Sequence, residues 1–167
     1  MSLLRLRAKT RRFLRRDSAA TDPILVIAAI AVSLVLLIGG SFAVGGMISN
    51  AKNLNAQADL DKVATSEVAA NSGGGTYMNW NITTAGVIAG DTDTSGNKLN
   101  TQAVGFTPTA GDEIKVVANG TGWIAGSLSP TGAQYFRSST SSTTYVGAAA
   151  ATAAGAVPAG LTIPTLP

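Results

Sequence analysis

The sequence contains no cysteine and no histidine. The chain therefore forms no disulfide, has no Cys/His zinc site, and carries neither a thiol nucleophile nor a Ser-His-Asp triad. Charged residues make up only 13% of the chain and aromatic residues only 5%. Because no set of reactive side chains stands out in what remains, we do not expect an enzyme.

Positive charge is concentrated at the N-terminus. From Thr21 onward, five basic and eight acidic residues give a net charge of −3, so the high isoelectric point belongs to the first segment alone. The sequence as a whole therefore indicates no nucleic-acid partner. The basic residues of that first segment are Arg5, Arg7, Lys9, Arg11, Arg12, Arg15 and Arg16.

A long apolar run follows at positions 24–44, and positions 23–51 contain no charged residue. A helix over 24–44 is about 30 Å long at ~1.5 Å per residue, which matches a bilayer core. The basic residues before it should remain in the cytoplasm and the rest should face outward. A cleaved secretory signal is the alternative, but its apolar core is usually ~7–15 residues with the small residues after it. Here the small residues precede the run.

The helical pattern continues through positions 48–70, so we predict one long helix over 21–72. Pro23 suits its first turn, and the glycines at 73–75 favour an end there. An imperfect stripe with helical spacing runs through Ile48, Leu54, Ala58, Leu60, Val63, Ala64, Glu67 and Val68.

Four glycines fall inside this helix, and each costs about 1 kcal/mol in helix propensity relative to alanine. One interpretation is close packing of neighbouring helices against small residues. The other is a stretch that unwinds when subunits pack. The four are Gly39, Gly40, Gly45 and Gly46.

A β-rich head is predicted over 73–147, which makes the fold α+β with a small antiparallel sheet. The Asn119-Gly120 pair is a hairpin signal between two strands. Residues 148–167 are rich in Ala, Gly and Pro, and form either a flexible tail or an extended strap. The expected strands are 86–89, 113–118, 122–127, 134–138 and, more weakly, 143–146.

This arrangement resembles the type IV pilin family. Residues 18–30 are similar to the region that a prepilin peptidase reads, and residues 112–138 are similar to the head strands of Gram-positive pilins. The resemblance implies a basic leader over 1–20 that is cleaved at the membrane. It also implies a precursor that waits in the cell membrane and a homo-oligomeric helical filament built by a pilus assembly platform outside the cell.

The processing site departs from the usual pattern, because many pilins carry glutamate at the fifth mature position. Cleavage after Ala19 or Ala20, just before Thr21, fits the preference for a small residue. Asp22 would then lie close to the new N-terminus. It either pairs with the N-terminal amine of a neighbouring subunit or caps the helix at the membrane edge.

A weak calcium candidate is formed by Asp91, Asp93 and Ser95, which open like a calcium-binding loop. The acid that would close such a loop is replaced by Gln102, and a solvated turn is the simpler interpretation. No other cofactor is expected. The adjacent acids Asp112 and Glu113 should point to opposite faces of a strand, which does not suit an acid–base pair.

Three aromatic residues, Tyr77, Trp80 and Trp123, could form a stacking surface, but in a head with few large residues we expect them in the core. Asn81 and Asn119 begin formal glycosylation sequences, and the hydroxyls at 138–144 are further acceptors.

The sequence therefore predicts the structural subunit of a type IV pilus filament. Alternatives are a minor subunit of a secretion or DNA-uptake machine and a single-span surface-anchored binding module. Adhesion, motility and DNA uptake share one architecture, so the role of the filament stays open.

Overall fold

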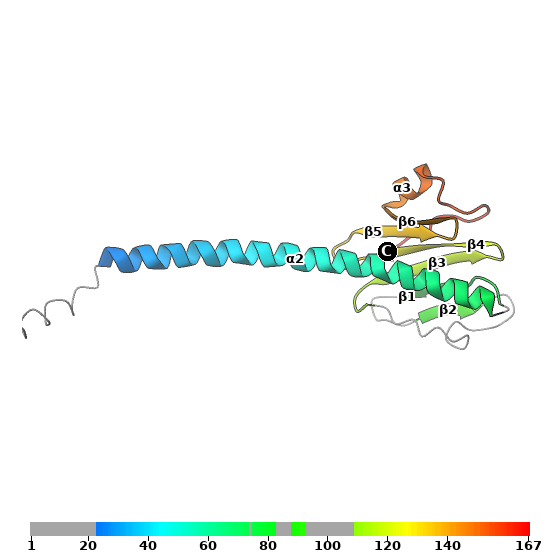
Figure 1. Cartoon of the computed structure of the whole chain (residues 1–167), viewed down its shortest axis with the longest axis horizontal. Helices are drawn as coiled ribbons and strands as arrows, with labels where there is room; N and C mark the ends of the chain where they lie inside the picture. The colour runs from blue at the N-terminus through cyan, green and yellow to red at the C-terminus, as the bar shows by residue number, and fades with distance from the viewer. Residues whose placement is uncertain (1–22, 74, 83–87, 93–108) are drawn as a thin grey trace, which may run out of the picture. The chain divides into compact units, whose positions relative to one another are not determined.

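The computed structural model of the chain describes residues 23–73, 75–82, 88–92 and 109–167. It consists of a long helix, a six-stranded antiparallel sheet and a short helix, which confirms the predicted α+β fold (Figure 1). The chain divides into two compact units: α2 up to Gly46, and Met47–Pro167, which we call the head unit.

Helix α2 spans Pro23–Ser72. Proline begins it because its missing N–H would have no partner in the first turn, and its φ is already helical. The helix ends at the glycines, where Gly73 N donates to Ala69 O at 3.0 Å. The end at Ser72 agrees with the sequence prediction, and the predicted start at position 21 lies outside the described residues.

The sheet has the strand order β2-β1-β3-β4-β5-β6, and every neighbouring pair is antiparallel. Its strands are β1 (Asn79–Ile82), β2 (Ile88–Thr92), β3 (Glu113–Asn119), β4 (Gly122–Leu128), β5 (Gln134–Ser138) and β6 (Ser141–Val146).

The β3–β4 hairpin forms where the Asn-Gly pair predicts it, with Asn119 opposite Gly122. Gly120 does not adopt a left-handed conformation, however. The turn is held instead by Asn119 Oδ1, which accepts hydrogen bonds from Thr121 N, Thr121 Oγ1 and Gly122 N at 2.9–3.0 Å. The side chain of asparagine therefore stabilises this turn more than the freedom of glycine does.

Strands β3, β4 and β5 confirm the expected ones within a residue or two, and β6 begins earlier than expected. The expected strand at 86–89 is β2, which runs later and includes Asp91 and Thr92 instead of leaving them in a turn. Strand β1 was not predicted. Its segment Asn-Trp-Asn-Ile alternates polar and apolar residues over only four positions, which is too short a pattern to stand out.

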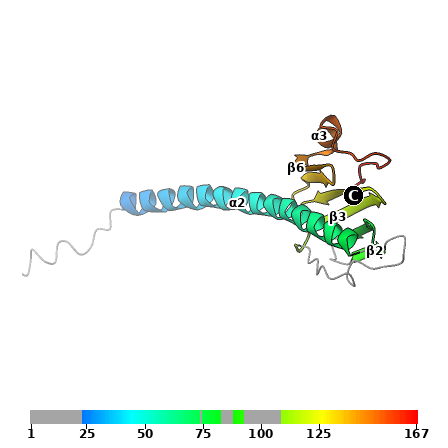
Figure 2. The ribbon, with the colours of Figure 1, turned by 45° about the vertical axis from the view of Figure 1, so that its right-hand side comes forward.

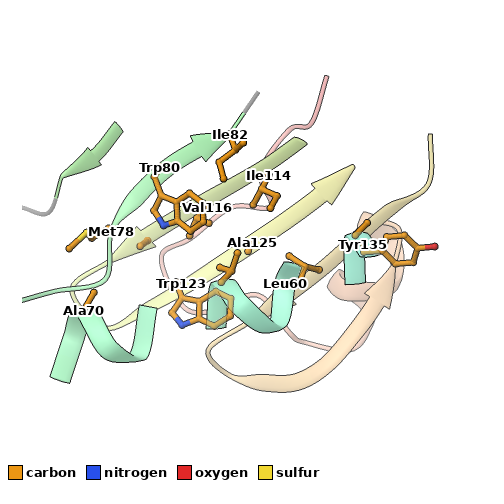
Figure 3. Close-up of a cluster of buried hydrophobic side chains, with 13 residues drawn as sticks. Leu60, Ala70, Met78, Trp80, Ile82, Ile114, Val116, Trp123, Ala125 and Tyr135 are labelled. Carbon is orange, nitrogen blue, oxygen red and sulfur yellow. The ribbon is translucent and has the colours of Figure 1, made fainter. Parts of the chain in front are cut away.

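One face of the sheet packs against the second half of α2 (Figures 1 and 2). Figure 3 shows Trp80, Val116, Trp123 and Ala125 from the strands in one buried cluster with Leu60 of the helix. The inner face of α2 is the set of residues that contacts this core: Ala56, Asp59, Leu60, Val63, Ser66, Glu67 and Ala70.

The helical stripe expected from the sequence was therefore partly wrong. Leu60, Val63 and Glu67 are buried against the sheet, but Ile48, Leu54, Ala58 and Val68 are exposed. The sequence pattern combined residues from two different sides of the helix.

The other face of the sheet is covered by the C-terminal residues. Helix α3 (Ala148–Ala153) contacts β5 and β6, and residues 154–167, which we call the strap, follow it. Leu166 and Ala151 are buried with Phe136, and Ile163 packs beside them. Of the two interpretations of the C-terminal residues, the structure favours the strap over the flexible tail.

Candidate functional site

The largest exposed apolar surface among the described residues lies on α2 before the head unit. Every residue from Pro23 to Gly46 is exposed, and Phe42 is the extreme case with 79% of its surface accessible. By length and composition, this helix is able to cross a membrane. Such a surface does not remain bare in water, so lipid or protein must cover it.

The few polar side chains within this segment are satisfied by the helix itself. Ser33 Oγ donates to Ala29 O and Ser41 Oγ to Leu37 O, both at 2.8 Å. A hydroxyl bonded to the carbonyl four residues earlier needs no water, so both serines are compatible with an apolar environment.

The four glycines expected to act in assembly all lie in regular helix. A Cβ atom added at Gly39, Gly40, Gly45 or Gly46 would meet no atom within 4 Å. Packing within the chain therefore gives no reason for glycine at these positions. Both interpretations of them, close helix packing and unwinding, depend on neighbouring molecules.

The residues expected at the processing site lie at the edge of the described structure. Pro23 is the first residue of α2. Ala19, Ala20, Thr21 and Asp22 lie outside the described residues, so the cleavage site and the pairing of Asp22 stay predictions.

Glu67, on the inner face of α2, is a fully buried acid of the head unit. Its Oε2 accepts a hydrogen bond from Met78 N at 2.9 Å, and its Oε1 accepts one from Trp80 Nε1 at 2.5 Å. Burial raises the pKa of Glu67 to about 7, although the bonds from Trp80 and Met78 oppose the rise. The carboxyl joins the end of α2 to the start of β1.

A second polar cluster joins α2 to the segment that enters β3. Asp59 accepts hydrogen bonds from Thr109 N at 2.7 Å and Thr109 Oγ1 at 3.0 Å, and it pairs with Lys62 Nζ at 2.6 Å. Burial raises the pKa of Asp112 to about 6; the negative charge of Asp59 adds to the rise and Lys62 opposes it.

Asp112 is buried and Glu113 is half-buried at the start of β3, which agrees with the expectation of alternating faces. Asp59 and Glu67 both accept hydrogen bonds from residues outside α2, and these bonds attach the helix to the rest of the head unit. We therefore assign both acids a structural role.

The weak calcium candidate gains no support. Asp91 lies in β2 instead of opening a loop, while Asp93 and Ser95 lie outside the described residues. Within the part of the chain that the structure describes, no three acidic, histidine or cysteine residues gather to hold a metal ion.

The two tryptophans belong to the core, as expected. Trp80 and Trp123 are each only 2% exposed, and Tyr77 packs against them at the edge. They therefore provide no stacking surface for a sugar or a nucleic-acid base.

The two formal glycosylation sequences differ in their surroundings. Besides the three bonds that its oxygen accepts, Asn119 donates from Nδ2 to Ala159 O at 3.1 Å, so both the oxygen and the nitrogen of its amide have partners. Asn81 lies half-buried in β1. Of the hydroxyls at 138–144, Ser142 and Thr143 are exposed on β6, whereas Thr140 Oγ1 donates to Ala156 O at 3.0 Å.

Sequence reasoning missed the two clusters that attach α2 to the sheet. It placed Glu67 in an apolar stripe without recognising the carboxyl as an acceptor, and it gave Asp59 no role. The available signal was an acid at an inward helical position, since a buried charge needs partners and indicates a polar contact across the core.

The chain matches no protein-family model, and no curated protein and no solved structure is significantly similar to it.

Proposed function

We propose that the chain is the subunit of an extracellular filament of the type IV pilin class. The observation that carries the proposal is the continuous, uncharged and exposed helix up to Gly46, joined to a head unit that covers its own core. The proposal also rests on the resemblance of residues 18–30 to a prepilin processing region.

The apolar segment would be covered by lipid before assembly and by neighbouring subunits after assembly. Before assembly it lies in the cell membrane, and a prepilin peptidase removes the basic leader on the cytoplasmic side. An assembly platform then moves the subunit into a helical filament of identical copies. There the apolar segments exchange lipid for one another, which keeps them out of water throughout.

The head unit suits such a transfer because the residues that form and cover its core all lie within it. The sheet is covered on one face by residues 56–70 of α2 and on the other by α3 and the strap. The head unit would therefore remain folded while the segment before it changes its surroundings.

A second candidate, a single-span surface-anchored module, is favoured by the same membrane-compatible helix. It would keep its N-terminus and remain in the membrane. A minor subunit of a secretion machine would be processed but scarce.

The test is the intact mass and N-terminal sequence of the protein in material sheared from cells. A start at Ala20 or Thr21 in an abundant fibrous fraction is the expected result. A protein that begins near Met1 and stays with the membranes would overturn the proposal in favour of the anchored module. A start after Val44 would identify an ordinary secreted protein.

A further inference from the structure

The hairpin turn between β3 and β4 contains the only asparagine in the sequence that is followed by glycine, Asn119-Gly120. An asparagine in this context is able to modify itself, because the backbone nitrogen of the next residue can attack the side-chain carbonyl carbon, Cγ. Glycine at the next position has no side chain to obstruct that attack. The turn therefore holds a nucleophile and an electrophile in adjacent residues.

Three hydrogen-bond donors surround the oxygen on which negative charge would develop during this attack. Asn119 Oδ1 accepts from Thr121 N at 3.0 Å, from Thr121 Oγ1 at 2.9 Å and from Gly122 N at 2.9 Å. Donors that converge on such an oxygen lower the barrier of acyl transfer, as those of an oxyanion hole do. They also polarise the Cγ–Oδ1 bond before the attack, which makes Cγ a better electrophile.

The attacking nitrogen is accessible. Gly120 is exposed, and none of the described residues accepts a hydrogen bond from its backbone N–H. Attack requires this nitrogen to lose its proton, and an N–H that has no protein partner can pass its proton to solvent. The turn therefore leaves the nucleophile available while it holds the oxygen of the electrophile.

We propose that Asn119 is a deamidation site whose conversion releases part of the strap. Gly120 N attacks Cγ, a C–N bond forms, and Nδ2 leaves as ammonia, which gives a cyclic imide. Water then opens the imide at either of its carbonyls to aspartate or isoaspartate. The net reaction consumes water, releases ammonia and needs no oxidant or reductant. The inference concerns the head unit and does not depend on the proposed filament.

The product lacks the donor that holds the strap at this point. Asn119 Nδ2 donates to Ala159 O at 3.1 Å, and after conversion a carboxylate oxygen would face that carbonyl oxygen instead. Two acceptors this close repel each other, so the strap should detach around 158–160. Thr140 Oγ1 still binds Ala156 O, so the release should be local. In the aspartate product, the donors of the turn keep a carboxylate oxygen as their acceptor, and the hairpin should stay closed.

The test is a time course of the purified full chain in detergent at neutral pH, followed by mass spectrometry of a tryptic digest made at mildly acidic pH. Cleavage after Lys115 and Arg137 gives a peptide in which Asn119 is the only asparagine. Asn71, which is exposed and followed by serine, is the internal control. Asn119 should convert at least about tenfold faster than Asn71, a difference of roughly 1.4 kcal/mol in activation free energy.

Three variants test the donors and the product, and tryptophan fluorescence checks that each is folded. Thr121→Val removes the hydroxyl donor but keeps the backbone donors, so it should slow the conversion about threefold. Asn119→Asp reproduces the product, and thermolysin, which cuts before large apolar residues such as Leu161, should cleave its strap faster than that of the natural chain. Asn71→Asp adds the same charge at the end of α2 and should leave the cleavage rate unchanged.

Each part of the proposal has an outcome that would overturn it. Equal conversion of Asn119 and Asn71 would exclude the deamidation site. Equal conversion in Thr121→Val and the natural chain would show that the hydroxyl donor does not assist the attack. Equal cleavage of Asn119→Asp and Asn71→Asp would exclude release of the strap. If Asn119→Asp does not fold, the partly converted natural chain gives the same comparison, because mass distinguishes converted from unconverted molecules among the cleaved ones.

Discussion

At the scale of single residues, the head unit is unusual in where it places its acids. Glu67 is fully buried and is met by two hydrogen-bond donors, one from the backbone and one from an indole. Both oxygens of the ionised carboxylate accept hydrogen bonds, but the carboxylate is removed from water. The loss of water has the larger effect on the pKa of Glu67.

The stability of the head unit should therefore depend on pH through Glu67. The pKa rises from 4.5 to about 7 on folding, so the folded state holds the proton more tightly than the unfolded state. The resulting stabilisation is fully present below pH 4.5 and is lost as the pH rises from about 4.5 to about 7. The loss is on the order of 3 kcal/mol, since one pKa unit corresponds to about 1.4 kcal/mol.

The measurement is urea unfolding of the full chain in detergent, followed by fluorescence of Trp80 and Trp123, at a series of pH values. Glu67→Gln cannot ionise, so its free energy of unfolding should fall less over this range. Asp112 contributes in the same direction, because its pKa also rises on folding, to about 6. Equal slopes for the natural chain and Glu67→Gln would contradict the role of Glu67.

At the scale of elements, β4 depends on two glycines that leave room for the strap. A Cβ atom at Gly126 would lie 2.8 Å from the Phe136 ring and 3.1 Å from Leu166 Cδ1, and one at Gly122 would lie 3.1 Å from Pro158. The strap therefore contacts the backbone of β4 where these glycines lack side chains.

Gly126→Ala should loosen the strap and destabilise the head unit by about 1–3 kcal/mol, because the buried Phe136 ring and Leu166 must both move. Gly120→Ala is the matched control, since its Cβ meets nothing within 4 Å and should change stability by less than about 0.5 kcal/mol. Urea unfolding measures both, and limited proteolysis within 154–167 detects the released strap. Equal stability of the two variants would show that the close packing at Gly126 is not needed.

The comparison of sequence with structure is clearest at this scale. The β3–β4 hairpin was predictable because its alternation and its turn are contained in one short segment. Strand β1 was not, because Trp80 and Ile82 become recognisable as core residues only when α2 and β3 lie against them. The same limit caused two helix faces to be combined into one stripe.

The candidate site was predictable in kind but not in detail. The apolar helix follows from composition alone, because the absence of charge over 23–51 needs no tertiary information. The roles of Asp59 and Glu67 depend on donors that lie 50 and 11–13 positions away in the chain, respectively, which periodicity cannot reveal.

At the scale of the whole molecule, membrane insertion of the chain should depend on the apolar segment before the head unit. Leu36→Lys places a charge at the middle of that segment, where insertion of lysine costs about 2.5–3.5 kcal/mol. The variant should be lost from the carbonate-resistant membrane fraction, while Asn55→Lys, exposed in the head unit, should remain there. Equal membrane retention of both variants would show that the segment is not the anchor.

Residues 154–167 cover one face of the sheet without forming a strand of it. The six described strands are therefore paired with one another whether or not the strap is in place. A head unit whose strap has detached would expose the apolar face that carries Phe136, and any chaperone present could bind that face until the strap returned.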